Sequence, residues 1–211
     1  MQTLIPVFFT SNGFNSQNDG TFVDPDKNPD DVPSGDMDKF TLKTETYVSI
    51  TQVGITGPVF IDSPETICAA NYVKDVLTVI AGEIKKRTKK TNDPTTTRLV
   101  RDTRKFWFQQ DLARPHAAKV SQKWCKDNLP NFIDKDRAPP AFVEWPVEAF
   151  FGELKRRVYK AGRYPNLRTL KTAIRRECRG SWVFDWLKAT FATMDDRMQA
   201  VIDAKGQHTG Y

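Results

Sequence analysis

Residues 106–116 read FWFQQDLARPH, and this stretch decides how the rest of the chain is interpreted. Its aromatic half belongs to a predicted buried strand at residues 104–111, and Pro115 opens the helix that follows. Asp111 ends the strand, where α/β folds place functional groups, and His116 lies close by at the helix entry. A carboxylate held by a rigid strand suits a divalent cation, although an isolated aspartate in this place is more often a turn or N-cap residue.

A second informative stretch is PVEAFFGELKRRVYK, residues 146–160, which predicts a helix with one apolar face. Glu148 lies in its first turn behind Pro146, where an acidic side chain also stabilises the helix dipole. Gly152 follows one turn later, although glycine inside a helix costs about 1 kcal/mol relative to alanine. A small residue beside Glu148 would let a ligand or a backbone approach, so the helix start is a candidate site.

The remaining pattern predicts a mixed α/β domain with a helical C-terminus. Strands are expected at residues 4–9, in a hairpin over 47–61 and briefly at 132–133, with loops at 11–38, 91–103 and 139–140. Helices are expected after Ser63, after Pro115, and at 166–178 and 181–204. In the last helix an apolar stripe is typical of a helix that faces the core. It consists of Val183, Leu187, Phe191, Met194, Met198, Val201 and Ile202.

Composition narrows the class of protein. The 211 residues are 39% hydrophobic, which is typical of a globular domain. No apolar run approaches the roughly 18 residues of a membrane span, and the first ten residues lack the basic start of a signal peptide, so no membrane partner is expected. The three cysteines are widely spaced without a CxxC pair, which indicates reduced, packed thiols and no zinc site.

Several stretches resemble one family. FQQDLARPHAAKVSQKW (108–124) is similar to the second-aspartate motif of mariner-superfamily DDE transposases, and PVEAFFGELKRRV (146–158) resembles their third-carboxylate motif. VSITQVGITGPVFID (48–62), AANYVKDVL (69–77) and the ending RMQAVIDAKGQHTGY (197–211) also resemble the family, so the likeness covers roughly residues 14–211. It implies an RNase H-like mixed sheet flanked by helices, with a catalytic core at 1–160 and a helical extension at 161–211.

The resemblance also implies an activity. The family cleaves DNA and transfers strands with Mg²⁺ or Mn²⁺, so Asp111 and Glu148, with 36 residues between them, are the expected catalytic and metal-binding residues. The implied partners are transposon ends and target DNA, with a homodimer and no small-molecule substrate. A nuclear location is expected from the DNA substrate and from KKRTKK at 85–90.

One part of the family pattern is missing. The family's first aspartate closes the first strand, but here Thr10, Ser11 and Asn12 occupy that place, unless the motif lies upstream of Met1. Without this carboxylate the chain is expected to bind one cation loosely and to cleave little DNA. Two hypotheses follow: a transposase-like nuclease domain, or a non-catalytic remnant that binds nucleic acid or protein.

Basic residues suggest a DNA-binding surface. The formal net charge is +6, and residues 148–180 carry ten cations against three carboxylates. Phosphate contacts would give salt-sensitive affinity for DNA, whereas the alternative is a set of merely solvated helix faces. The predicted DNA-binding residues are Lys155, Arg156, Arg157, Lys160 and His116.

Overall fold

The computed structural model describes residues 2–11, 42–62, 67–88, 99, 103–138, 146–205 and 207. The predicted loops at 11–38, 91–103 and 139–140 lie wholly or mostly outside these ranges. So do the last two residues of KKRTKK and most of the residues after 205.

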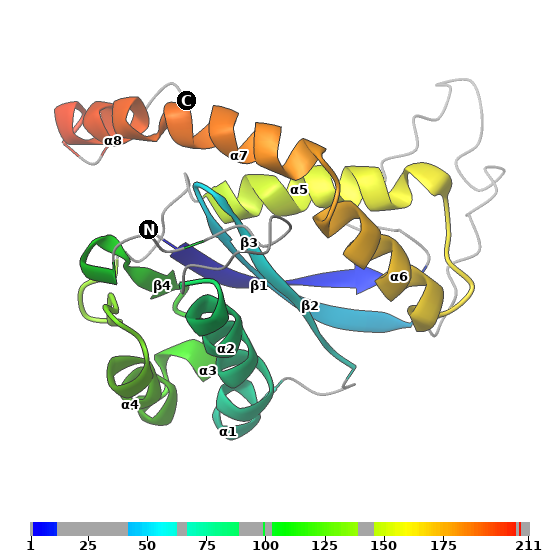
Figure 1. Ribbon diagram of the computed structural model, residues 1–211, viewed down its shortest axis with the longest axis horizontal. Coiled ribbons are helices and arrows are strands. Elements are labelled where there is room, and N and C mark those ends of the chain that lie inside the picture. Colours follow the sequence, from blue (N-terminus) through cyan, green and yellow to red (C-terminus); the bar gives the residue numbers. More distant parts are fainter. Residues whose placement is uncertain are drawn as a thin grey trace, which may run out of the picture.

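The described part of the chain builds a four-stranded sheet in the order β3-β2-β1-β4 (Figure 1). The strands are β1 (Gln2–Thr10), β2 (Lys43–Thr51), β3 (Gly54–Ile61) and β4 (Phe108–Gln110). β2 pairs antiparallel with both β1 and β3, whereas β4 runs parallel to β1. Phe132 adds an isolated parallel bridge beyond β4. The expected mixed sheet is therefore confirmed, with the predicted strand at 104–111 shortened to three residues after a 3-10 turn, η3 (Thr103–Lys105).

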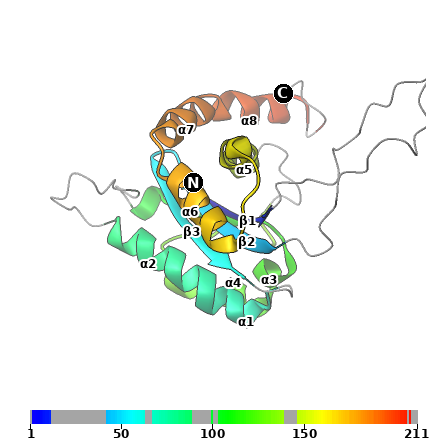
Figure 2. The ribbon, with the colours of Figure 1, turned by 90° about the vertical axis from the view of Figure 1, so that its right-hand side faces the viewer.

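Helices cover both faces of the sheet (Figure 2). One face carries α1 (Ala69–Asn71), the π-helix η2 (Tyr72–Leu77), α2 (Thr78–Lys86), α3 (Arg114–Ala117) and α4 (Lys119–Asn128). The other face carries α5 (Pro146–Val158), the 3-10 turn η4 (Tyr159–Ala161), α6 (Leu167–Cys178) and α7 (Trp182–Ala192). Among the helices that the structure describes, none has the length and apolarity to cross a bilayer.

Alternation along β2 explains how one sheet supports two cores. Val48 and Ile50 are buried with Phe9 against α5, α6 and α7. Tyr47, one residue out of phase, is buried on the opposite face with side chains from η2, α2 and β4. Successive side chains of a strand point to opposite faces, so both faces of a central strand must be apolar when helices cover both.

The helical C-terminus differs from the prediction. The helix expected at 181–204 is broken at Thr193 into α7 and α8 (Met194–Asp203). Val183 and Leu187 are buried, but α8 buries no residue and Ile202 is 65% exposed. The interpretation of the apolar stripe as core-facing is therefore wrong for α8. The predicted domain boundary at residue 160 stays a prediction, and side chains of α6 and α7 share one core with β1 and β2.

We expect the two halves of this stripe to respond differently to truncation. Leu187→Ala, at a fully buried position, should lower the free energy of unfolding by about 2–5 kcal/mol. Ile202→Ala, at an exposed position, should change it by less than about 0.5 kcal/mol. Urea denaturation of both variants measures the difference, and equal losses would mean that α8 packs against the domain in solution.

Candidate functional site

Asp111 lies directly beyond β4, and its side chain is 31% exposed. The Oδ1 atom accepts a hydrogen bond from the Ala113 backbone N–H at 3.0 Å, which makes an Asx turn. The same oxygen is 2.5 Å from Nδ1 of His116. The turn geometry that the sequence offered as an alternative is therefore present, and it leaves the second carboxylate oxygen without a hydrogen bond among the described residues.

His116 is buried rather than exposed. Its exposed fraction is 1%, its ring stacks on Tyr72 with the centroids 4.3 Å apart, and its Nε2 atom has no hydrogen-bond partner in the part of the chain that the structure describes. The backbone oxygen of His116 accepts from the side-chain amides of Gln110, at 3.0 Å, and Gln122, at 2.9 Å. The predicted contact between His116 and DNA does not fit this burial, and the structure instead places His116 against Asp111.

Glu148 lies in the first turn of α5 and is exposed, while its neighbours Val147 and Phe150 are fully buried. This arrangement follows from helical spacing, since the apolar face of α5 rests on the sheet. Gly152, one turn further on, is also exposed, and outside the backbone of α5 no described atom lies within 4 Å of the position that a Cβ would take. The surface beside Glu148 is therefore open, as the small residue suggested.

Asp111 and Glu148 lie at the same level along β1. Leu4 pairs with Gln110, so Asp111, the next residue, is level with Ile5. α5 runs alongside β1 in the same direction (Figures 1 and 2), and the hydroxyl of Tyr159 bonds both the N–H and the carbonyl oxygen of Thr10. Glu148 precedes Tyr159 by about 16 Å along the helix. This length equals about five residues of strand, so counting back from Thr10, which Tyr159 contacts, places Glu148 beside Ile5.

This level corrects the expected place of the missing carboxylate. The sequence put Ser11 there, but the carbonyl oxygen of Ser11 accepts a hydrogen bond from the N–H of Tyr164 at 2.7 Å, beyond the far end of α5. Ser11 therefore lies about one helix length away from Glu148. The position level with both carboxylates is residue 5, in the interior of β1, and it is an isoleucine.

The donor set only partly fits a divalent metal centre. Within the described ranges, no three His, Cys, Asp or Glu side chains lie close enough together to hold an ion. Asp111 offers one carboxylate oxygen without a hydrogen bond to a described residue, and Glu148 offers an exposed carboxylate. Two carboxylates suit a hard cation such as Mg²⁺ but give it few protein ligands.

A third acidic residue near Asp111 was missed in the sequence. Glu45 of β2 is 9% exposed and pairs in register with Phe8. Burial raises the pKa of its carboxyl group, the nearby Tyr47 hydroxyl lowers it, and Asp111 and His116 both lie close enough to act on its charge. The only pattern in the sequence that could have pointed to Glu45 is its alternation with Tyr47 and Ser49 on one side of β2. Such alternation is typical of a half-exposed strand.

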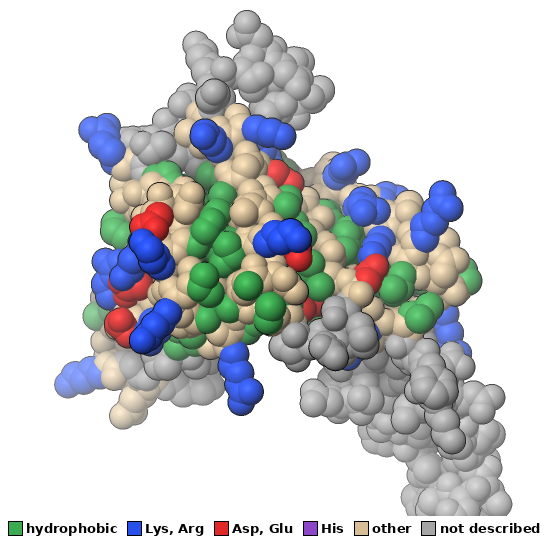
Figure 3. Space-filling view, turned by 90° about the horizontal axis from the view of Figure 1, so that it is seen from below, with side chains coloured by type: hydrophobic (Ala, Val, Ile, Leu, Met, Phe, Trp, Pro, Cys, Tyr) green, Lys and Arg blue, Asp and Glu red, His purple; other side chains and the backbone are tan. Residues whose placement is uncertain are grey.

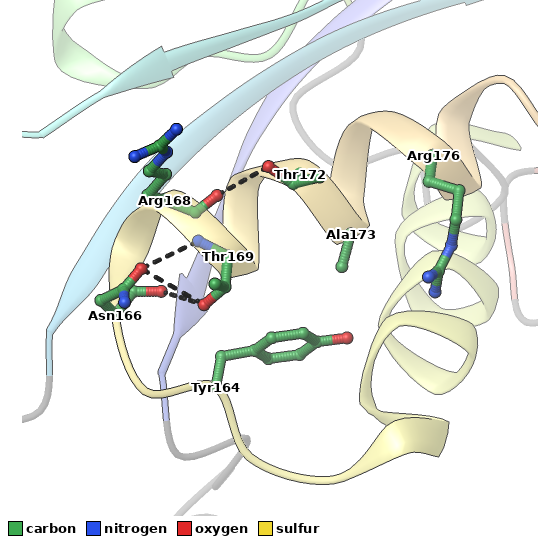
Figure 4. A pocket seen from close by; sticks show the side chains of 7 residues that line it. All are labelled: Tyr164, Asn166, Arg168, Thr169, Thr172, Ala173 and Arg176. Carbon is green, nitrogen blue, oxygen red and sulfur yellow. Dashed lines mark hydrogen bonds between the residues drawn. The ribbon is translucent and has the colours of Figure 1, made fainter.

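The predicted DNA-binding cations of α5 have different surroundings. Arg156 and Arg157 both bond Glu153, at 2.7 Å and 2.5 Å. Lys155 is half-buried with its ammonium group 5.9 Å from the centre of the Phe9 ring, and burial lowers the pKa of that ammonium group. Lys160 is exposed at the end of α5. Beyond it, a hollow of about 400 Å³ follows α6, with Arg168 and Arg176 at its two ends (Figure 4).

The fold is that of a known transposase catalytic domain. The chain aligns with the Mos1 transposase paired-end complex with left transposon end at a TM-score of 0.69 and 15% identity, covering 98% of this chain and 55% of that chain. It aligns with the catalytic domain of Mos1 mariner transposase at a TM-score of 0.60 and 14% identity, covering 99% and 83%. The Mos1 mariner paired end complex with Mn gives a TM-score of 0.65 at 15% identity, covering 98% and 56%.

These alignments establish the RNase H-like architecture that the sequence predicted. The chain spans about half the length of the Mos1 chains in the DNA complexes, with 55% covered in the first of them. No protein-family model and no curated protein matches the sequence.

We expect Glu45→Gln to stabilise the domain at neutral pH. The pKa of the Glu45 carboxyl group is raised above its ordinary value of 4.5 by burial, so the folded state holds the proton to a higher pH than the unfolded state does. Stability is therefore lost as pH rises through the raised pKa, and the glutamine variant avoids this loss. Thermal melts should show a higher Tm for the variant at pH 7 and no gain below about pH 4.

Glu153→Gln is a control that should have the opposite effect on stability at neutral pH. Arg156 and Arg157 lower the pKa of Glu153 to about 2, so its contribution is present above pH 4.5 and disappears as pH falls toward 2. This variant should therefore have a lower Tm at pH 7. A Glu45→Gln variant that melts below the parent at pH 7 would show that the carboxylate is stabilised in its site.

Proposed function

We propose that this chain is the catalytic domain of a mariner-like DDE transposase in which the metal centre has two of its three carboxylates. It binds DNA, holds one divalent cation weakly through Asp111 and Glu148, and cleaves little DNA as it stands. One observation carries the proposal: in a fold shared with the Mos1 catalytic domain, both carboxylates lie level with residue 5 of β1.

The chemistry of such a centre explains why a third carboxylate matters. Divalent ions, when bound, activate the attacking oxygen and stabilise the leaving oxygen of a phosphodiester. Asp111 is held by the Asx turn, so its geometry does not depend on the ion. Glu148 is exposed on a helix whose opposite face is locked into the core, so it too keeps its place. Residue 5 adds no oxygen ligand between them.

DNA is the proposed partner, and transposon ends are the proposed substrate. The aligned Mos1 structures include complexes with transposon-end DNA, and cations gather from Lys160 along α6. Transposases of this type work as dimers on transposon ends and target DNA in the nucleus, and we extend the proposal to these properties. KKRTKK at 85–90 supports the nuclear location.

A non-catalytic DNA-binding module is the second candidate. It is favoured by the absence of a three-residue metal cluster from the part of the chain that the structure describes. The two candidates differ in whether a carboxylate restored to β1 also restores cleavage.

We expect the purified chain to nick supercoiled DNA slowly or not at all in Mg²⁺ or Mn²⁺. Ile5→Asp should raise nicking at least tenfold, because an aspartate at residue 5 is level with Asp111 and Glu148. Ser11→Asp is the matched control, since it adds the same charge at the far end of α5 and should leave the rate unchanged.

Gel analysis of product against time measures both variants, each also combined with Asp111→Ala. Nicking by the parent chain that disappears in Asp111→Ala would show that two carboxylates suffice. Equal rates for Ile5→Asp and Ser11→Asp would contradict the placement of the centre and would favour the non-catalytic module.

The cations along α6 should dominate DNA binding. Arg168→Glu with Arg176→Glu should weaken affinity for duplex DNA at least tenfold and make it less sensitive to salt, since fewer counterions are released. Lys123→Glu on α4 is the control, because α4 covers the opposite face of the sheet from α6. The side of the molecule at the bottom of Figure 1, where α4 lies, shows cations, anions and apolar side chains mixed together (Figure 3). Fluorescence anisotropy at several salt concentrations measures the affinity of the parent chain and of both variants for duplex DNA. Equal losses of affinity in the two variants would contradict a DNA-binding surface along α6.

A further inference from the structure

The contacts around Asp111 form a closed network that reaches well beyond a turn. His116 contacts Oδ1 of Asp111 from a fully buried position and is stacked on Tyr72. The hydroxyl of Tyr72, which is 0% exposed, donates to Oε1 of Gln110 at 2.8 Å. Gln110 and Gln122 both donate to the backbone oxygen of His116. Of these four buried side chains, His116 contacts the partly exposed carboxylate, and the other three hold His116 in place.

We propose that His116 is a positioning residue that fixes which oxygen of Asp111 faces a metal ion. This inference rests on the proposed function, because it assigns a role within the same site. The Oδ1 atom already accepts from the Ala113 N–H and lies against His116 Nδ1. Oδ2 accepts no hydrogen bond from the described residues, so it is the atom left for the cation. Asp111 then binds the cation through one oxygen, in an orientation set before the cation arrives.

The surroundings of the imidazole ring select its tautomer. An Nδ1–H group can donate to Oδ1, and Nε2 then carries a lone pair instead of an N–H. Nε2 is buried with no hydrogen-bond partner among the described residues, and a buried N–H group without a partner lowers stability. The Nδ1–H tautomer therefore pairs the N–H group and leaves only the lone pair of Nε2 without a partner among the described residues. Such outer contacts orient metal-binding side chains in many metal sites, and their loss typically weakens metal affinity about 10–100-fold.

A merely structural role would predict something different. If His116 only filled space between the sheet and η2, any side chain of similar size would replace it. His116→Phe keeps the size and the stacking on Tyr72 but cannot donate to Asp111. His116→Asn loses the ring, yet its side-chain nitrogen occupies the branch that Nδ1 occupies in histidine and can donate to Oδ1. The two variants therefore separate packing from donation.

The experiment measures Mn²⁺ affinity, thermal stability and the hydrogen exchange of the Ala113 amide for the parent chain and both variants. His116→Phe should melt within a few degrees of the parent, bind Mn²⁺ at least tenfold more weakly, and exchange the Ala113 amide faster, because Asp111 is free to rotate. His116→Asn should melt lower, because it leaves a cavity, yet bind Mn²⁺ within about threefold of the parent. Stability and affinity thus move in opposite directions.

Two results would overturn the proposal: Mn²⁺ binding by His116→Phe equal to that of the parent, or unchanged exchange of its Ala113 amide. A different result would overturn the proposed function alone. In that case Mn²⁺ binds neither the parent nor Asp111→Asn, while Ala113 exchange still depends on a donor at residue 116. The amide measurement needs no metal, so the two failures are distinguishable.

Discussion

The parallel hydrogen bonding between β1 and β4 determines where Asp111 lies in the domain. β4 contributes only three residues, and their pairing with Gln2–Leu4 is what holds the strand end beside the centre of the sheet. A shift of one residue in this register would turn Asp111 to the other face, because side chains alternate along a strand. The antiparallel pairing of β1 with β2 brings Glu45 within electrostatic reach of Asp111 and His116, and the packing of α5 on β1 sets the level of Glu148. The contacts of β1 with β4, β2 and α5 thus position the three acidic side chains of the site.

The buried polar side chains next to the pairing of β1 with β4 lower the stability of the domain. Gln110 and His116 are at most 2% exposed, beside the aromatic and aliphatic side chains of the core that contains Tyr72. Buried amides are tolerated when they are hydrogen-bonded, and Gln110 meets this condition at both ends of its side chain. His116 does not, since Nε2 meets no hydrogen-bond partner within the described ranges. A buried polar atom without a partner is what a site retains when geometry matters more than stability.

Local patterns were enough to predict most elements but could not place the site. The period-two alternation of residues 47–51 and the helical spacing of residues 146–158 predicted β2 and α5 correctly, because burial imposes these periods directly. The apolar stripe predicted wrongly that α8 faces the core. Such a stripe indicates which face of a helix is apolar, but it does not indicate whether another element covers that face. Ser11 was placed wrongly for a related reason: the level of a residue along β1 depends on its pairing with β4, more than a hundred residues away. Glu45 was missed because the sequence of β2 alone does not show that its side chain is buried in the fold.

Under the proposed function one carboxylate of the metal centre is absent, and its absence need not disturb the domain. The two cores consist of apolar side chains, and neither Asp111 nor Glu148 belongs to them. Carboxylates brought together without a cation repel one another and raise one another's pKa, so a complete set destabilises the metal-free fold. An apolar residue inside β1 removes that repulsion and suits a strand covered on both faces. The stability of the fold and the ability to bind a metal ion therefore depend on different residues. A chain of this kind can retain the sheet, the Asx turn of Asp111 and the basic face of α6 after cleavage has been lost, because none of the three depends on the missing oxygen ligand.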